Sequence, residues 1–263
     1  MKRVTILRVF FAALLLVFTA AAYSADYDAV AEKLKAAMAA PGRPQADVIR
    51  DANRKPIKTL KFFGLRDNMR VVELFPGRGW YTRLLAPVLR DKGDLYIAYG
   101  TRWDESHLLG KAPFDKVKVA ARGAKLIRVP GAGHTHGGRG MNMENADLGV
   151  SDVDMVLTFR NYHDLTPAGR LAMNKAIFKA LKPGGIYGVV DHTRRHMEPD
   201  NPENGRRVDP VEAIKSVQAA GFVLVDYSTL HYRPDDELRY EVGRKTVTGN
   251  TDRFTLKFMK PLK

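Results

Sequence analysis

The sequence contains no cysteine, so neither a disulfide bond nor a thiolate metal site can form in this chain. It also has no His-Glu-x-x-His segment, the helical pattern of many zinc sites, and no internal repeat. These absences exclude a disulfide-stabilised scaffold, a cysteine-based metal centre and a repeat array. The 263 residues are enough to bury a full core in one α/β domain.

Acidic residues are outnumbered by basic ones, with 29 Asp and Glu against 43 Lys and Arg, and the formal net charge is +14. Such a surface favours anionic partners, namely acidic lipid headgroups, envelope polysaccharides or nucleic acid. The basic residues are dispersed along the chain, however, and no basic stripe is interleaved with aromatic residues. We therefore predict a solvated basic surface and expect no nucleic-acid partner.

Long hydrophobic runs are absent except near the N-terminus. There, Lys2, Arg3 and Arg8 precede the apolar run Val9–Val17, and small residues follow at Ala20–Ala25. This order is typical of a secretory signal peptide, and the run is short for a membrane span. We predict a signal peptide over residues 1–25 and a periplasmic or secreted protein without a stable membrane span after cleavage; an uncleaved anchor is the alternative.

The most informative segment runs from Val71 to Thr82 and reads Val-Val-Glu-Leu-Phe-Pro-Gly-Arg-Gly-Trp-Tyr-Thr. An apolar strand carries Glu73 near its end, a Pro-Gly turn follows, and the pattern then becomes helical. Gly77 and Gly79 let the backbone approach a ligand closely, where backbone N–H groups can contact it. The alternative is a helix entry with no ligand, since a lone Gly-x-Gly is a weak motif.

With this segment the chain resembles the class I S-adenosylmethionine (SAM) dependent methyltransferases, and among them an often exported bacterial branch with Glu-x-x-Pro-Gly-x-Gly-Trp-Tyr-Thr. Phe75 stands where the superfamily usually has the first glycine of its motif. The resemblance implies a SAM pocket in which Glu73 lies near the methionine amino group. The cofactor-binding residues that it implies are Glu73, Phe75, Pro76, Gly77, Gly79, Trp80, Tyr81 and Asn161.

Strand and helix patterns alternate from Arg70 onward, which predicts an α/β fold of the Rossmann-like, doubly wound kind. The resemblance implies a mostly parallel seven-stranded sheet with an antiparallel last strand. Helices are expected after Asn161, with Thr166 as N-cap, and after Asp209, where Glu212 would complete a capping box. The expected strands are Arg70–Leu74, Leu95–Tyr99, Ala124–Val129, Val153–Phe159, Ile186–Asp191, Phe222–Ser228 and Phe254–Met259.

Two further regions flank or interrupt this pattern. Residues 26–66 read as a helical lead-in, broken at Pro41, Pro56 and Gly64, that covers one edge of the methyltransferase-like domain at residues 67–263. The polar segment 233–252 lies between the last two strands. We expect it to be an excursion from the sheet that could serve as a lid.

Polar groups that follow the strands should meet in one crevice, because parallel strands end at the same edge of a sheet. The segment after the fourth strand supplies the predicted catalytic residues Asn161, His163 and Asp164. His163 titrates near neutrality and could act as a general base. The alternative is a structural histidine that is hydrogen-bonded to Asp164 or to the backbone.

A metal site is a further alternative, since imidazole binds zinc, copper and nickel. The candidate ligands are His134, His136, His163, His192 and His196. SAM-dependent methyl transfer needs no metal in most members of the resembled superfamily, so we assign none. The loop Gly131–Gly140 is then expected to be a glycine-rich segment that closes over a ligand.

One residue that the resemblance implies is missing: no acid stands directly at the end of the second strand to hold the ribose hydroxyls. Asp104 is the candidate replacement, and Tyr99 or Trp103 could stack on the adenine. The predicted function is SAM-dependent methyl transfer to a small-molecule or envelope acceptor. The alternative is an exported, non-catalytic binding protein that recognises a ligand or an envelope component on the same scaffold.

Overall fold

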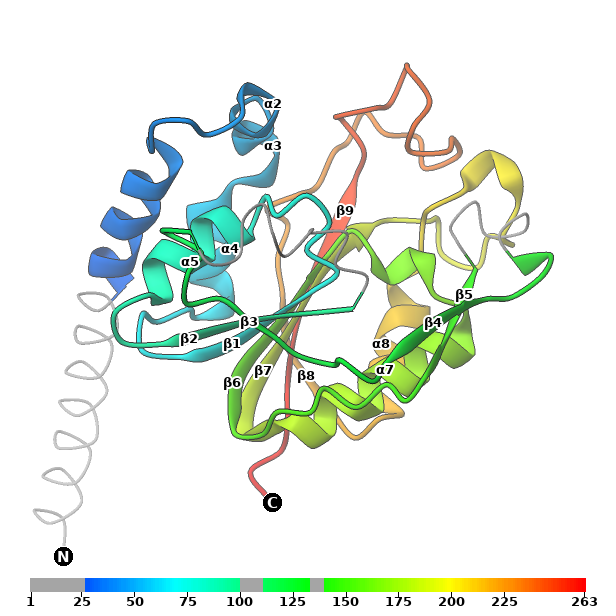
Figure 1. The fold of residues 1–263 in the computed structure, drawn as a ribbon. Coiled ribbons are helices and arrows are strands. Elements are labelled where there is room, and N and C mark those ends of the chain that lie inside the picture. The colour runs from blue at the N-terminus through cyan, green and yellow to red at the C-terminus, as the bar shows by residue number, and fades with distance from the viewer. Residues whose placement is uncertain (1–26, 100–110, 133–139) are drawn as a thin grey trace, which may run out of the picture.

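The computed structural model describes residues 27–99, 111–132 and 140–263, and its centre is a seven-stranded sheet (Figure 1). The strand order is β3-β2-β1-β6-β7-β9-β8, and only β9 runs antiparallel to its neighbours in the sheet. This confirms the predicted Rossmann-like sheet with an antiparallel last strand. The strands of this sheet are β1 (Arg70–Leu74), β2 (Asp94–Ala98), β3 (Lys118–Val119), β6 (Val153–Phe159), β7 (Leu181–His192), β8 (Val223–Tyr227) and β9 (Arg253–Met259).

Helices cover both faces of the sheet, as the continuous apolar strands require. Val71 and Val72 are both fully buried but lie in different hydrophobic clusters, because successive side chains of a strand point to opposite faces. The helix over residues 27–38, α4 and α5 pack on one face, and α7 and α8 pack on the other. The named helices are α2 (Gln45–Val48), α3 (Asp51–Arg54), α4 (Pro56–Phe63), α5 (Thr82–Leu89), α7 (Pro167–Ala180) and α8 (Pro210–Gln218).

The N-terminal helices belong to the same core as the sheet, as the predicted lead-in requires. Leu34 and Leu60 are fully buried in the cluster that contains Val71. The part of the lead-in between Pro41 and Pro56 is two single-turn helices, α2 and α3, instead of one continuous helix. Both lie above the edge of the sheet where β1 and β6 end, so they can contribute to a site there (Figure 1).

The prediction that Ala124–Val129 forms the third strand of the main sheet is wrong. Residues Lys125–Arg128 form β4, but β4 pairs only with β5 (Met141–Glu144) in a separate antiparallel sheet. The third strand of the main sheet is the two-residue β3. It occupies the edge position next to β2, and Lys125 and Arg128 of β4 are charged and exposed outside that sheet. The loop that follows β4 therefore does not come after a strand of the main sheet.

Two short 3-10 turns, Tyr162–Asp164 and Pro202–Asn204, complete the regular structure, and the helix caps agree with the sequence in part. Thr166 caps α7 by accepting a hydrogen bond from the Gly169 backbone, as predicted. Asp209 caps α8, but the predicted capping box does not form, because Glu212 pairs with Arg194 instead.

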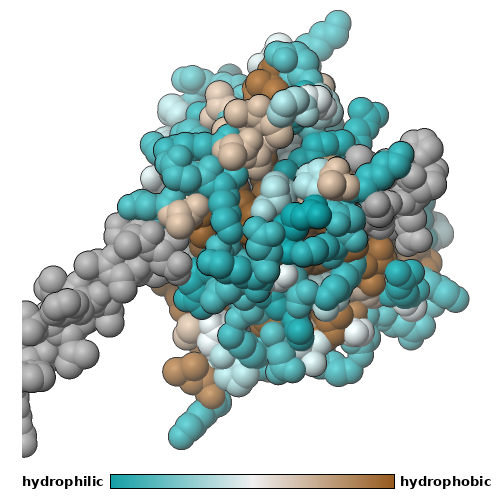
Figure 2. Space-filling model, turned by 60° about the vertical axis from the view of Figure 1, so that its left-hand side comes forward, coloured by the Kyte–Doolittle hydropathy of each residue, from teal (hydrophilic) through white to brown (hydrophobic). Residues whose placement is uncertain are grey.

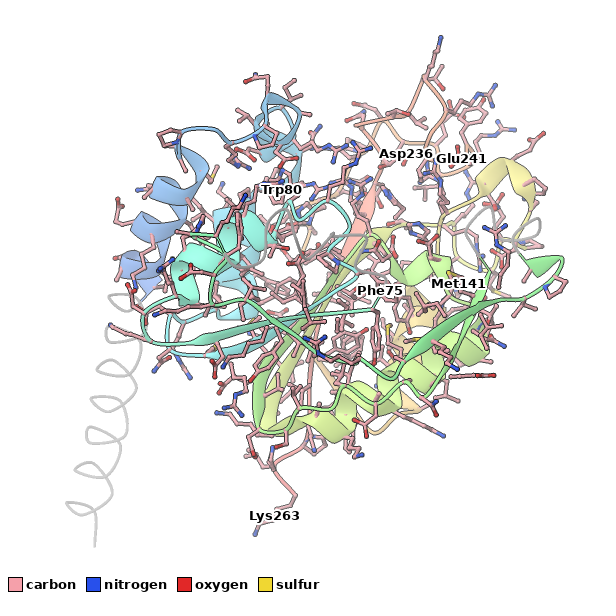
Figure 3. All side chains as sticks on the ribbon, viewed as in Figure 1. Phe75, Trp80, Met141, Asp236, Glu241 and Lys263 are labelled. Carbon is pink, nitrogen blue, oxygen red and sulfur yellow. The ribbon has the colours of Figure 1, made fainter. Side chains whose placement is uncertain are left out.

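The segment between β8 and β9 is irregular, as predicted, and it is tied down from within. Asp236 accepts two hydrogen bonds from the guanidinium of Arg207, at 2.8 and 2.9 Å, and neither side chain is exposed. Arg207 also donates to the backbone oxygens of Thr193 and Tyr240. In Figure 3, Asp236 and Glu241 lie in this segment, above the start of β9. The segment is therefore held as a fixed wall beside the sheet in this structure.

Hydrophilic side chains cover most of the face shown in Figure 2, and hydrophobic residues reach it only in small areas. No helix among residues 27–99, 111–132 and 140–263 is long and apolar enough to cross a membrane. The predicted signal peptide lies outside the described residues. So do the candidate adenine and ribose residues Trp103 and Asp104, and the candidate metal ligands His134 and His136.

Candidate functional site

The glycine turn after β1 has the strained backbone that a close ligand approach requires. Phe75, Gly77 and Gly79 have φ angles of 49°, 58° and 72°, and helix α5 begins only at Thr82. Phe75 has a left-handed backbone conformation, which glycine adopts without strain but other residues do not. This fits its position, where the resembled superfamily usually has glycine. The turn, rather than the helix itself, is thus the element that faces the sheet edge.

Glu73 is a buried carboxyl group immediately below this turn. Its side chain is 3% exposed, and the Thr82 hydroxyl donates a hydrogen bond of 2.6 Å to its Oε2. Burial raises the pKa of Glu73 to about 7, while the Thr82 hydrogen bond and the charge of Arg54 act in the opposite direction. Glu73 is therefore poised to change its ionisation when a cation binds nearby.

Asn161 connects the end of β6 to the turn after β1. Its Nδ2 donates hydrogen bonds to the backbone oxygens of Phe75, at 3.2 Å, and Phe159, at 2.7 Å. The chain continues from β1 to β2 on one side and leaves β6 for β7 on the other, so this is the switch point of the sheet. Open α/β sheets bind their ligands at such a point.

A cavity of about 200 Å³ lies at this position. Asp47 of α2, Arg54 of α3 and Arg50, which lies between the two helices, line it. Trp80 lies beneath these helices (Figure 3), and its indole N–H donates to the Asp47 backbone oxygen. Seven of the eight predicted cofactor residues line the cavity, and Gly79 is the exception: Glu73, Phe75, Pro76, Gly77, Trp80, Tyr81 and Asn161.

Tyr81 and Trp80 are wall residues of this cavity rather than surface residues. Both are at most 4% exposed, and the Tyr81 ring stacks on Phe159 with 3.5 Å between ring centroids. The guanidinium of Arg54 lies 4.4 Å from the centroid of the Trp80 ring. The cavity thus combines aromatic walls with two buried acids, Asp47 and Glu73, and with four arginines: Arg50, Arg54, Arg78 and Arg160.

His163 lies beside this cavity and is held by a carboxylate that the sequence did not single out as its partner. Its Nδ1 is 2.7 Å from Asp191 Oδ1, and its backbone N–H donates to Asp191 Oδ2. Its Nε2 is 3.8 Å from Asp164 Oδ1. His163 and Asp164 do not line the two cavities at this edge, so their catalytic role stays a prediction.

A second cavity of about 120 Å³ adjoins the first and is lined by Arg50, Arg54 and Arg160 in common with it. Arg253 and His192 also line it, and the segment between β8 and β9 closes its far side. Arg160 Nε donates to His192 Nε2 at 3.1 Å. Because a guanidinium can only donate, this nitrogen of His192 must accept, and His192 is neutral. Burial accordingly lowers the pKa of His192 well below its ordinary value.

Sequence reasoning missed the residues that other elements bring to this edge: Arg54, Arg160, Asp191 and Arg253. Arg160 directly follows the expected strand Val153–Phe159, and Asp191 ends the expected strand Ile186–Asp191, but the sequence assigned neither residue a role. Arg54 comes from the helical lead-in, and Arg253 begins the last strand. Each of these four residues is charged and stands at the boundary of a predicted element. Charged residues at such boundaries are frequent in a basic chain, so this feature alone could not identify the site.

The metal alternative finds no support among the described residues, where no group of three or more His, Asp or Glu side chains is placed to hold an ion. His163 and His192 lie 5.8 Å apart, measured between ring centroids. His196 instead bonds to Asp209. This finding does not extend to His134 and His136.

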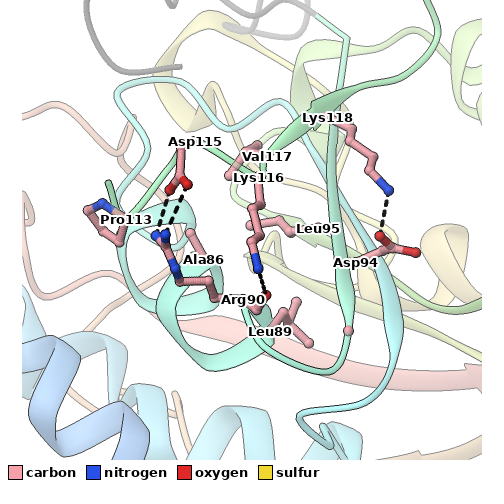
Figure 4. A pocket seen from close by; sticks show the side chains of 11 residues that line it. Ala86, Leu89, Arg90, Asp94, Leu95, Pro113, Asp115, Lys116, Val117 and Lys118 are labelled. Atoms are coloured by element: carbon pink, nitrogen blue, oxygen red, sulfur yellow. Dashed lines mark hydrogen bonds and ion pairs between the residues drawn. The ribbon is translucent and has the colours of Figure 1, made fainter. Parts of the chain in front are cut away.

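A larger cavity, of about 260 Å³, lies at the opposite edge of the sheet, where β2 and β3 begin (Figure 4). Four of its five charged side chains form two ion pairs, Arg90 with Asp115 and Lys118 with Asp94, and Lys116 donates to the Arg90 backbone oxygen. Ligands of open α/β sheets bind at the carboxyl ends of the strands, not at this edge. The switch-point cavities are therefore the candidate site.

No protein-family model and no curated protein sequence matches the chain. Among solved structures, it is similar to a SAM-dependent methyltransferase from Aquifex aeolicus, with 18% identity, a TM-score of 0.52 and coverage of 80% of this chain and 92% of that one. It is also similar to the (4+2)-cyclase SpnF, with 16% identity, a TM-score of 0.53 and 86% of each chain covered.

A third similar structure is human N-acetylserotonin methyltransferase in complex with SAM. The identity is 12%, the TM-score is 0.50, and the match covers 91% of this chain and 59% of that one. At such low sequence identity, the similarity to these structures concerns the fold alone. The chain has the Rossmann-like methyltransferase fold, and function must be argued from the site itself.

Proposed function

We propose that this protein is a SAM-dependent methyltransferase that holds the methionine end of SAM between the glycine turn and Asn161. The observation that carries the proposal is the buried carboxyl of Glu73 at the wall of the switch-point cavity. A buried acid without a cationic partner is costly, and the amino group of SAM would supply that partner. Gly77 and Arg78 are exposed in the turn, and their N–H groups would suit the methionine carboxylate, whereas those of Phe75 and Gly79 donate to the backbone oxygens of Ala98 and Pro76.

The donor set fits the methionine half of the cofactor. Its adenosine half would extend toward the carboxyl end of β2, which lies beside β1. Tyr99 ends that strand, and its ring lies 5.5 Å from Phe75, measured between centroids. We propose that Tyr99 contacts the adenine and that Asp104 supplies the missing acid to the ribose.

When bound, SAM supplies an electrophilic methyl group for in-line displacement. The protein's contribution is then mainly to orient the two reactants and to exclude water. Asp191 holds Nδ1 of His163 and so fixes the orientation of its ring, which would leave Nε2 as the atom that accepts a proton from the acceptor. Asn161 holds the turn against β6 and thereby fixes the floor of the site.

The second candidate function is an exported binding protein on the same scaffold. The similarity to a cyclase shows that this fold is compatible with other activities. We propose a periplasmic or secreted location from the predicted signal peptide, and N-terminal sequencing of the protein from cell fractions checks this. An intact Met1 in the cytosolic fraction would contradict it.

The cofactor assignment is tested by a matched pair of glycine variants. Gly77 and Gly149 both have positive φ angles, of 58° and 65°, so Leu imposes a similar backbone strain at either position. Gly77 lines the cavity, whereas Gly149 does not line it and has open space around it. We expect Gly77→Leu to weaken binding of S-adenosylhomocysteine by about tenfold or more in calorimetry, and Gly149→Leu to leave it unchanged.

Glu73→Ala should weaken the same binding about tenfold to a hundredfold, because it removes a charged hydrogen-bond partner of the amino group. If Gly77→Leu and Glu73→Ala both remain folded and bind S-adenosylhomocysteine like the wild type, the cofactor site lies elsewhere.

A further inference from the structure

The second cavity is lined by arginines and by no acidic residue. Arg54, Arg160 and Arg253 reach it from three different elements, α3, the end of β6 and the start of β9. Arg50 lines it as well but is exposed. A concentration of guanidinium groups in a small enclosed space is unfavourable unless an anion offsets their charge.

Most donors of these three side chains have no acceptor within the described part of the chain. Arg160 donates only from Nε, to His192, and Arg253 donates only from Nη1, to the Asn53 backbone oxygen. Nε of both Arg54 and Arg253 is buried without a hydrogen-bond partner. No described carboxylate forms a salt bridge with any of the three guanidinium groups, although Asp191 interacts electrostatically with Arg160 and Arg253, and Glu73 does so with Arg54.

Burial and mutual repulsion disfavour the charge on these side chains. The pKa of Arg54 is lowered to about 9 and that of Arg253 to about 10, first by burial and next by the positive charge of Arg160. His192 accepts from Arg160 Nε and so leaves the two terminal nitrogens of Arg160 as donors for a ligand. Arginine forks of this kind match the geometry of carboxylate and phosphate groups.

The position of the cluster separates it from the proposed cofactor. Glu73 lines only the first cavity, whereas Arg253 lines only the second. The carboxylate of SAM is attached to the same carbon as its amino group, so it must stay close to Glu73. An anion that contacts Arg253 from within the second cavity alone would belong to a second molecule, whereas Arg54 and Arg160 line both cavities.

We propose that Arg54, Arg160 and Arg253 bind an oxyanion group, a carboxylate or a phosphate, of the methyl acceptor. This inference rests on the proposed methyltransferase function. It assigns the acceptor to the anionic small molecules or anionic envelope components, and it explains why a site for a cationic cofactor contains three arginines.

The test is calorimetric titration of the purified protein with inorganic phosphate and, in parallel, with acetate, which tells which oxyanion the cluster prefers. We expect Arg253→Gln to weaken binding of the preferred anion about tenfold or more. Arg239→Gln is the matched control, because it removes the same charge from an exposed position in the neighbouring segment. Arg253→Gln should keep the melting temperature of the wild type without ligand, since it removes an uncompensated charge.

Repeating the titration of S-adenosylhomocysteine at saturating anion distinguishes the possible sources of the anion. Binding of both ligands together supports an acceptor site, whereas displacement would show that the cluster holds the cofactor's carboxylate and would overturn the inference. Equal anion binding by the wild type and Arg253→Gln would also overturn it. Anion binding without any binding of S-adenosylhomocysteine would refute methyl transfer, and the acceptor assignment with it, while leaving an anion site.

Discussion

Glu73 is the side chain through which this site senses pH. Its pKa in the folded protein, about 7, lies above the ordinary value of 4.5, so the folded state holds the proton more tightly than the unfolded chain. The resulting stabilisation is complete below pH 4.5 and is lost as the pH rises toward 7. The loss corresponds to about 3 kcal/mol, an order-of-magnitude figure for a shift of this size.

Glu73→Gln removes this titration while keeping an acceptor for the Thr82 hydroxyl. We expect the variant to melt at a higher temperature than the wild type at pH 8 and at nearly the same temperature at pH 4.5. Thermal melts of both proteins between these values measure the difference. A difference that does not change with pH would show that Glu73 is already ionised in the folded protein.

Residues whose roles are set by their immediate neighbours in the sequence were the predictable ones. Glu73 and the turn from Phe75 to Gly79 form one continuous segment, and the strand, turn and helix pattern is visible in it. The partner of His163 was not predictable, because Asp191 follows it by 28 positions and meets it only through the pairing of β6 with β7. Sequence proximity favoured Asp164 instead.

The irregular segment before β9 depends on one buried ion pair. Arg207 and Asp236 are both fully buried, and the Asp236 carboxylate also accepts from the backbone of Leu238 and Asp252. Asp236→Ala leaves the guanidinium buried without its partner, a change that typically costs about 3–5 kcal/mol. We expect a loss of that order in denaturant unfolding.

The neighbouring pair of Arg206 and Glu241 provides the control. Both side chains are about one-third exposed, so solvent screens their interaction. Glu241→Ala should cost less than about 1 kcal/mol. Similar losses in Asp236→Ala and Glu241→Ala would mean that the segment is not held by its buried pair.

Among the elements, apolar strands were predicted well and amphipathic or charged ones poorly. The run Val153–Phe159 is buried almost throughout and could only be an inner strand. Lys125–Arg128 has a strand-like pattern too, but nothing local indicates that it pairs with Met141–Glu144 rather than with the main sheet. That choice is made by long-range pairing and by the exposure that its charged residues require.

The seven-stranded, mostly parallel sheet with an antiparallel last strand was predicted from a resemblance, and the structure confirms it. The residues that line the two candidate cavities were predicted only in part, because the N-terminal helices and the segment before β9 supply the others from opposite ends of the chain. Arg54 and Arg253 are separated by 199 positions in the sequence and line one cavity. No local pattern links two positions so far apart, so only the folded arrangement identifies the arginine cluster.

Binding of SAM in the switch-point cavity can be measured by calorimetric titration of the unmodified protein with SAM and S-adenosylhomocysteine at pH 8, above the pKa of Glu73. We expect one bound molecule per chain for each ligand, with a dissociation constant between about 1 μM and 1 mM, the usual range for enzyme substrates. Absence of binding by both ligands at millimolar concentration, in protein that melts cooperatively, would contradict the claim.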